Sequence, residues 1–209
     1  MPEEKRAVEA APKGNEPEEK MDLKTCIVTY LHDVIFYLTI FVILLLLVFR
    51  IVIVSGTSMN MTLLDGDYLL LLSNVFYQNP EPGDIVVISK DSFDDGAPIV
   101  KRIIATGGQI VDIDFAAGIV YVDGEPLQED YTYTLTNTTG GMSFPLTVEE
   151  GCLFVLGDNR NGSRDSRYVE IGLIDEREIL GKAIFLFLPG DNGDRNPQPR
   201  DFGRIGVIN

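Results

Sequence analysis

Apolar residues fill positions 34–54 almost without a break, interrupted by Thr39 and by Arg50 near the far end. At about 1.5 Å per residue, a helix of this length spans roughly 31 Å, about one hydrocarbon core of a bilayer. The pattern predicts a membrane-proximal segment and one transmembrane helix over residues 25–54. A cleaved secretory signal is the alternative, but its apolar region would be shorter and a small-residue cleavage pattern would follow it.

The segments on either side of the apolar run differ in composition. Residues 1–24 are rich in Glu, Pro, Lys and Ala with almost no large apolar side chains, so we expect a disordered tail. Lysines precede the run as far as Lys24, whereas after Arg50 no Lys or Arg occurs before Lys90. Because Lys and Arg accumulate in cytoplasmic segments, we expect a single-pass protein of the cell membrane with its N-terminus in the cytoplasm and residues 55–209 outside it.

Beyond the apolar run, hydrophobic residues occur in short groups separated by Gly, Pro, Asp or Asn, and no long helical period appears. Such groups, rich in Val, Ile, Leu and aromatic residues, are typical of strands. Strands are predicted at residues 68–72, 84–89, 99–104, 110–114, 119–122, 153–156 and 183–188. The fold class is therefore mostly β, with one domain over residues 55–209 and a smaller excursion at about 123–152.

The composition narrows the possible partners and cofactors. The 209 residues carry a net charge of −15, which argues against a nucleic-acid partner. One histidine and two distant cysteines offer no metal-binding spacing, and we expect neither a metal nor a cofactor. Cys26 and Cys152 would lie on opposite sides of the membrane and should not pair, and we expect Cys152 to be a buried apolar residue.

A small polar segment, Ser55-Gly-Thr-Ser-Met-Asn-Met-Thr-Leu63, follows the apolar run, and Ser58 is our candidate nucleophile. A serine hydroxyl needs a base to take its proton. The only histidine, His32, would lie across the membrane, so a Ser-His-Asp triad is excluded and a lysine base remains. Lys101 is the candidate, because the apolar residues of Ile99-Val-Lys-Arg-Ile-Ile104 could lower its pKa by up to about 3–5 units. On spacing alone two alternatives stay open, a solvated lysine on a strand and a serine that only makes a turn.

Five sequence blocks stand in order behind the apolar run. They are Ser55-Gly-Thr-Ser-Met59 with Thr62-Leu63, Gly66-Asp-Tyr-Leu-Leu70, Val100-Lys-Arg-Ile-Ile104, Gly157-Asp-Asn-Arg-Asn-Gly-Ser-Arg-Asp-Ser-Arg-Tyr168 and, more weakly, Gly181-Lys-Ala-Ile-Phe185. Together they resemble the type I signal peptidases, membrane-bound Ser-Lys endopeptidases of bacteria. The resemblance covers most of the chain from residue 34 onward and implies that family's catalytic domain of coiled β-strands.

The resemblance also implies roles for individual residues. Ser58 would be the nucleophile, Lys101 its general base, and Ser163 the hydroxyl that orients the lysine amine. Some members of the family have an oxyanion-binding serine where this chain has Gly56. We therefore expect only backbone N–H groups, those of Ser58 and Gly56, to bind the oxyanion.

Four further residues of the 157–168 block would support the site. By the resemblance, Asp165 and Arg167 would brace this loop, and Asp158 with Asn159 would shape its turn. The excursion at about 123–152, with its Tyr-Thr repeats and Thr-Thr-Gly-Gly, is expected to lie away from the site.

The function implied by the resemblance is the removal of signal peptides from exported preproteins at the outer face of the membrane, with the preproteins and the bilayer as partners. It also implies small side chains at the first and third positions before the cut. One alternative is a non-catalytic membrane-anchored binding or assembly protein, against which the presence of Ser58, Lys101 and Ser163 together argues. Another is a Ser-Lys self-cleaving protein of the repressor type, against which the apolar span and the lack of a DNA-binding segment argue.

Overall fold

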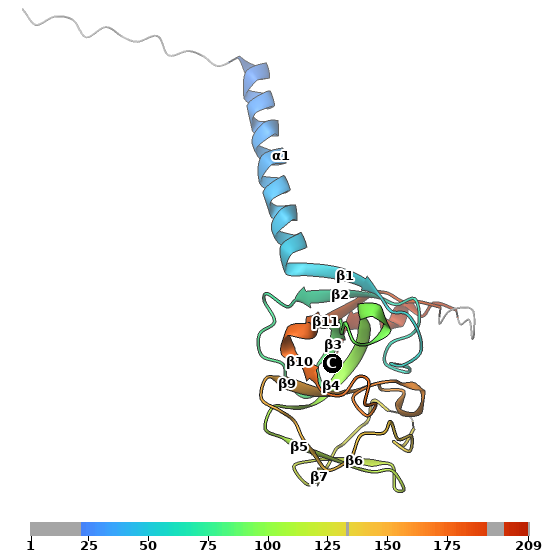
Figure 1. Cartoon of the computed structure of the whole chain (residues 1–209). Helices are drawn as coiled ribbons and strands as arrows, with labels where there is room; N and C mark the ends of the chain where they lie inside the picture. Colours follow the sequence, from blue (N-terminus) through green and yellow to red (C-terminus); the bar gives the residue numbers. More distant parts are fainter. Residues whose placement is uncertain (1–21, 133, 192–198, 209) are drawn as a thin grey trace, which may run out of the picture. The chain divides into compact units, whose positions relative to one another are not determined.

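The computed structural model describes residues 22–132, 134–191 and 199–208 (Figure 1). One α-helix lies near the N-terminus of this part of the chain, and strands and turns make up most of the rest. The prediction of a mostly β chain with one apolar N-terminal helix is confirmed. The predicted disordered tail, residues 1–24, lies outside the described residues up to position 21.

Helix α1 (Leu23–Val48) is apolar along its length, and none of its residues is buried. By length and composition it could cross a membrane. The helix begins before the predicted apolar span and also ends before it. It ends early because the last part of the apolar run forms strand β1 (Phe49–Ile53), which pairs with β2 (Tyr68–Ser73). A continuous apolar run does not by itself distinguish a helix from a strand, and here the pairing of β1 decides.

The larger of the two sheets in the described chain has eight antiparallel strands. Their order is β1-β2-β11-β3-β4-β9-β10, and β12 pairs with β11. The further strands of this sheet are β3 (Ile85–Ile88), β4 (Ile99–Thr106), β9 (Cys152–Leu156), β10 (Ile174–Asp175), β11 (Ile179–Leu188) and β12 (Gly206–Val207). The short 3-10 helices are η1 (Asp94–Gly96), η2 (Arg160–Gly162), η3 (Glu176–Glu178) and η4 (Phe202–Arg204).

A smaller antiparallel sheet has four strands in the order β7-β6-β5-β8. They are β5 (Ile110–Asp114), β6 (Ile119–Val122), β7 (Glu125–Pro126) and β8 (Leu146–Thr147). All seven strands predicted from the sequence are present in the two sheets.

The apolar core is divided among three clusters. One lies at the β1–β2 end of the larger sheet, and its buried residues are Val54, Met59, Leu63, Leu69, Leu71, Ile85, Val87, Ala183 and Leu186. Another packs β4 and β9 against the smaller sheet, with Phe154 among its buried residues. Because Met59 belongs to the first cluster, the residue after Ser58 ties the loop between β1 and β2 to the core.

Candidate active site

Ser58 lies in the loop that joins β1 to β2. The base of this loop is closed by two backbone hydrogen bonds, from the Val54 N–H to the Asp67 carbonyl (2.8 Å) and from the Gly66 N–H to the Val54 carbonyl (2.9 Å). Asn159 holds the loop from the other side, because its N–H donates to the Ser58 carbonyl (3.0 Å) and its Nδ2 donates to the Thr57 carbonyl (2.9 Å). The backbone on both sides of the Ser58 N–H is therefore fixed by one residue.

Lys101 lies on β4, opposite Val86 of β3, and is only 3% exposed. Its Nζ is 2.8 Å from the Ser58 Oγ and donates a hydrogen bond to the Val100 carbonyl (2.9 Å). The structure thus brings the predicted serine and the predicted lysine within hydrogen-bonding distance of each other.

The surroundings of Lys101 favour the neutral amine. Burial lowers the pKa of Lys101 from 10.5 to about 8, while the charges of Asp165 and Asp158 oppose this shift. Among the residues that the structure describes, Lys101 forms no ion pair that would restore the charge. An amine that already donates to Val100 can use its lone pair to accept the proton of Ser58.

A small cleft of about 90 Å³ opens beside the two residues. Its lining residues are mostly apolar: Val52, Ile53, Val54, Ser55, Ser58, Met59, Val87, Pro98, Ile99, Val100 and Lys101. Within the described chain, β1 pairs only with β2, and residues 99–101 of β4 pair only with β3. Two strands with a free edge therefore contribute to the lining of the cleft.

Ser163 is 4% exposed, and its Oγ has no hydrogen-bond partner among the described residues. The structure therefore does not join Ser163 to Lys101 by a hydrogen bond. Gly157 separates Ser163 from the nucleophile loop, since a Cβ at this position would lie 2.2 Å from the Ser163 Oγ and 2.5 Å from the Ser58 carbonyl oxygen. Any side chain at position 157 would therefore clash with both Ser163 and the Ser58 carbonyl, and only a glycine fits between them.

The two backbone groups expected to bind an oxyanion differ in availability. In the part of the chain that the structure covers, the Ser58 N–H donates to no protein acceptor. The Gly56 N–H, by contrast, donates to Asp65 Oδ1 (2.6 Å). Contrary to our expectation, the Gly56 N–H is therefore not free, because a nearby carboxylate already accepts from it.

Asp158 and Asp165 are fully buried, and each is paired with an arginine. Arg102 donates to Asp158 through Nε (2.9 Å) and Nη2 (2.8 Å), and Thr62 Oγ1 donates to the same carboxylate (2.5 Å). Arg167 donates to Asp165 through Nε (2.8 Å) and Nη2 (2.9 Å), and Asp165 also accepts from the Gly157 N–H (3.0 Å). Bidentate arginine pairs of this geometry fix the position of the carboxylates.

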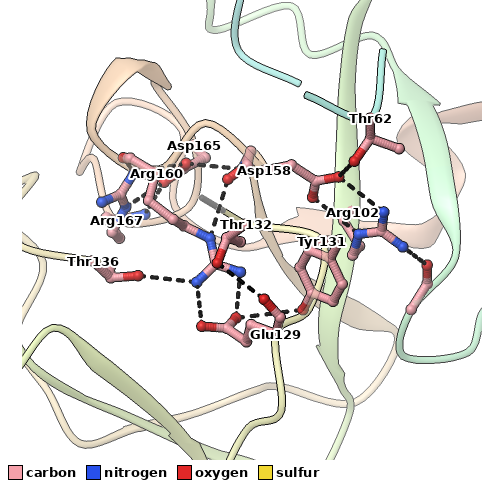
Figure 2. Close-up of polar contacts among 12 residues, drawn as sticks. Thr62, Arg102, Glu129, Tyr131, Thr132, Thr136, Asp158, Arg160, Asp165 and Arg167 are labelled. Carbon is pink, nitrogen blue, oxygen red and sulfur yellow. Dashed lines mark hydrogen bonds and ion pairs between the residues drawn. The ribbon is translucent and has the colours of Figure 1, made fainter. Parts of the chain in front are cut away.

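Sequence reasoning missed a third buried arginine and its partners. Arg160 is fully buried and forms an ion pair with Glu129, and its Nε donates to the Gly157 carbonyl (3.1 Å). The Tyr131 ring lies between Arg102 and Glu129 (Figure 2), with the Arg102 Cζ 4.0 Å from the ring centroid. Arg160 stands in the 157–168 block and could have been suspected, but nothing in the local sequence marks Glu129 or Tyr131 as neighbours of the site.

These contacts correct the prediction that the excursion at about 123–152 lies away from the site. The prediction is wrong for Glu129, Tyr131, Thr136 and Thr138, which contact Arg102, Arg160 or Arg167. Among the described residues, no group of three or more His, Cys, Asp or Glu is arranged to hold a metal ion.

Comparison with known proteins matches this chain to signal peptidases. The family model described as signal peptidase, peptidase S26, matches residues 27–188. "Probable signal peptidase I-1" of Synechocystis sp. is 36% identical over 144 residues, which cover 65% of this chain and 69% of that protein. Signal peptidase I of Bacillus licheniformis is 31% identical over 180 residues, 82% of this chain and 94% of that protein. A crystal structure of a signal peptidase I from Enterococcus faecalis matches 50% of this chain and 97% of its own, with 30% identity and a TM-score of 0.41.

Proposed function

Because this chain belongs to the signal peptidase family, peptidase S26, whose members are serine endopeptidases, we propose that it removes signal peptides with a Ser58–Lys101 dyad. One observation carries the proposal: the Lys101 Nζ lies 2.8 Å from the Ser58 Oγ in a buried, mostly apolar setting. A serine next to a base that can be neutral near physiological pH is an activated nucleophile.

In the first half of the reaction, the Ser58 Oγ attacks the carbonyl carbon of the scissile peptide bond while Lys101 accepts the hydroxyl proton. The Ser58 N–H stabilises the negative charge that develops on the carbonyl oxygen. Collapse of the tetrahedral intermediate breaks the C–N bond, and Lys101 returns its proton to the departing amine. The products of this half are an acyl ester on Ser58 and the released mature chain.

In the second half, water replaces the leaving amine. Lys101 takes a proton from the water, whose oxygen attacks the ester carbonyl, and Ser58 regains its proton as the ester bond breaks. With a pKa of about 8, roughly one Lys101 in ten is neutral at pH 7, compared with about one in a few thousand for a lysine in water. Burial supplies the whole of this increase in usable base, since the charges of Asp165 and Asp158 oppose it.

The cleft supports small side chains near the cut. An extended peptide can add to a strand with a free edge, and the side chains of its alternate residues then point to the same side. The first and third residues before the cut would therefore face the same cleft, whose volume of about 90 Å³ suits only small groups. This agrees with the specificity that the family resemblance implies.

The N-terminal helix supports a membrane anchor. Ser58 follows the end of α1 after a short stretch of chain, so the helix would hold the nucleophile near the bilayer surface. A substrate anchored by its own hydrophobic signal segment would then meet the enzyme at a high effective concentration. Together with the lysines before the helix, this supports a cytoplasmic N-terminus and a catalytic domain on the outer side.

Cleavage of a preprotein by the full chain in detergent or lipid vesicles tests the proposal. We expect the wild-type chain and Ser143→Ala, which changes an exposed serine, to cleave equally, and Ser58→Ala and Lys101→Ala to be inactive. Full activity of either of the last two variants would reject the dyad. Binding of the preprotein by the wild-type chain without cleavage would favour a non-catalytic binding protein.

A further inference from the structure

A segment between β7 and β8 contacts three buried arginines, one on β4 and two in the 157–168 loop. We call residues 129–132 and 134–138 of this segment the strap. Thr136 Oγ1 accepts a hydrogen bond from Arg160 Nη1 (2.9 Å), and the Thr138 carbonyl accepts one from Arg167 Nη1 (2.9 Å). The strap thus contacts arginines that lie far from it in sequence and belong to the 157–168 loop.

The carboxylate of Glu129 balances the charge of Arg160. Arg160 is fully buried and the Glu129 side chain is 13% exposed, and both guanidinium Nη atoms donate to the carboxylate, Nη1 at 2.8 Å. Tyr131 adds to this pair, since its hydroxyl donates to Glu129 Oε1 (3.3 Å). Loss of the Glu129 charge would leave an unbalanced cation in a buried site, which is strongly unfavourable, so the position of Arg160 depends on Glu129.

The aromatic ring of Tyr131 holds a second arginine. The Arg102 guanidinium stacks on this ring at 4.0 Å, while its edge binds both oxygens of Asp158 (Figure 2). Stacking on one face and bidentate hydrogen bonding along one edge together fix the plane of a guanidinium group. The position of the Asp158 carboxylate therefore depends on Tyr131.

Arg160 and Arg102 act on neighbouring residues behind the nucleophile. Arg160 Nε donates to the Gly157 carbonyl, and Gly157 packs against the Ser58 carbonyl oxygen. Asp158, held by Arg102, accepts from Thr62 Oγ1 in the same loop as Ser58. Two short chains of contact thus run from the strap to the two sides of the nucleophile loop.

We propose that Glu129 and Tyr131 are positioning residues for the Ser58–Lys101 pair, acting through Arg160 and Arg102. This inference rests on the proposed function. Neither residue lines the cleft beside Ser58 and Lys101, so both act on the alignment of the reacting groups rather than on substrate binding. Misplacement of reacting groups by about 1 Å can cost about 10²-fold in rate. A loss in kcat at unchanged KM is therefore the signature of positioning.

The test measures kcat and KM for cleavage of a preprotein by the full chain, together with the unfolding temperature of each variant. Glu129→Gln removes the charge at constant volume, and Tyr131→Leu removes the ring. We expect kcat to fall about 10- to 100-fold in Glu129→Gln and about 10-fold in Tyr131→Leu, with KM within about twofold of wild type. Tyr131→Phe keeps the ring and loses only the hydroxyl bond to Glu129, so its kcat should lie between those of Tyr131→Leu and the wild type. Asp130→Asn changes an exposed neighbour and should keep the wild-type kcat.

The two contact chains also predict how the changes combine. Arg160→Met removes the cation that Glu129 balances, so adding it to Glu129→Gln should cost less than the product of the two single effects. If Glu129→Gln does not fold, Tyr131→Leu and the charge-keeping Glu129→Asp carry the test, and Glu129→Asp should retain more of kcat than any uncharged substitution.

A wild-type kcat in folded Glu129→Gln or Tyr131→Leu, whatever their unfolding temperatures, would overturn the inference and leave the strap an architectural element. An equal loss in the Asp130→Asn control would overturn it too. Failure of the proposed function looks different, because the wild-type chain would then not cleave or Ser58→Ala would remain active.

Discussion

Lys101 and Arg102 are adjacent on β4, and almost equally buried at 3% and 2% exposure, yet their side chains enter opposite environments. Successive residues of a strand point to opposite faces of the sheet. Lys101 reaches the mostly apolar cleft beside Ser58 and, within the described residues, forms no ion pair. Arg102 reaches a polar network, where it binds Asp158, the Gly83 carbonyl and the Tyr131 ring.

This difference shows how one strand can hold both a reactive group and its support. A lysine can lose its proton when buried without an anion, whereas an arginine keeps its charge and must be paired. The apolar side of β4 therefore produces a base at the expense of stability, and the polar side produces a rigid scaffold. The predictions below change one side at a time.

The largest effect should come from a lysine that cannot lose its charge. Lys101→Arg keeps a cation that stays protonated at any usable pH, so it cannot accept the Ser58 proton. We expect cleavage of a preprotein to fall by at least about 10³-fold. As a control, Lys90→Met, which changes a lysine paired with Glu178, should cleave like the wild type. Residual activity of Lys101→Arg above a tenth of the wild-type activity would argue against Lys101 as the general base.

On the polar side, the expected effect is on stability. Arg102→Met leaves the fully buried Asp158 carboxylate without its arginine, which should lower the free energy of unfolding by about 3–5 kcal/mol. Urea unfolding of the full chain in detergent measures this change. The double variant Arg102→Met with Asp158→Leu should recover most of the lost free energy of unfolding. An unchanged free energy of unfolding in Arg102→Met alone would show that the buried Asp158 does not depend on Arg102 for stability.

Replacing Lys101 with methionine should have the opposite effect on the free energy of unfolding from replacing Arg102. The pKa of Lys101 is about 8 in the folded chain and about 10.5 unfolded, so at pH 7 folding must oppose the charge of a buried amine. Lys101→Met should therefore raise the free energy of unfolding by up to about 3 kcal/mol at pH 7.

The pH dependence of this gain checks its origin. Between pH 8 and 10.5 the unfolded wild-type chain binds more protons than the folded chain, so wild-type stability rises with pH. The advantage of Lys101→Met should be complete below pH 8 and should disappear above pH 10.5. If Lys101→Met were less stable than the wild type at pH 7, burial of the lysine amine would not be lowering the stability of the wild-type chain.

The last prediction concerns how the cleavage rate depends on pH. Because only the neutral amine accepts the Ser58 proton, kcat/KM should fall about tenfold for each pH unit below about 8 and should level off above it. A series of cleavage rates between pH 5 and 9 measures this limb. The exposed-serine variant Ser143→Ala should show the same profile, and a rate that does not change between pH 5 and 8 would contradict a lysine base.

Much of the fold could be predicted because its signals are local. The seven longer strands of the two sheets after β1 follow from short apolar groups bounded by turn residues, as in β5 and β6. The two-residue strands β7, β8, β10 and β12 could not be predicted, because two residues carry no alternation. The predicted apolar span runs to residue 54, past the end of α1 at Val48, because most of Phe49–Ile53 is apolar and only its pairing with β2 makes it a strand.

Some residues of the candidate site could likewise be predicted from the sequence, and others could not. Ser58 and Lys101 could be proposed because removal of the only histidine from consideration left a lysine base, and the sequence blocks resemble those of a known family. Glu129 and Tyr131 could not, since their contacts with Arg160 and Arg102 join segments far apart in the chain. The use of the Gly56 N–H by Asp65 likewise depends on how a loop closes, which composition does not reveal.

The pKa of the Lys101 amine is the most direct test of the account. It can be measured by NMR titration of the full chain in detergent with isotope-labelled lysine, the Lys101 signal being assigned by its absence in Lys101→Met. We predict that this signal titrates near pH 8, while exposed lysines titrate near 10.4. A Lys101 signal that titrates with the exposed lysines would contradict the account, because the amine beside Ser58 would then be charged whenever the enzyme works.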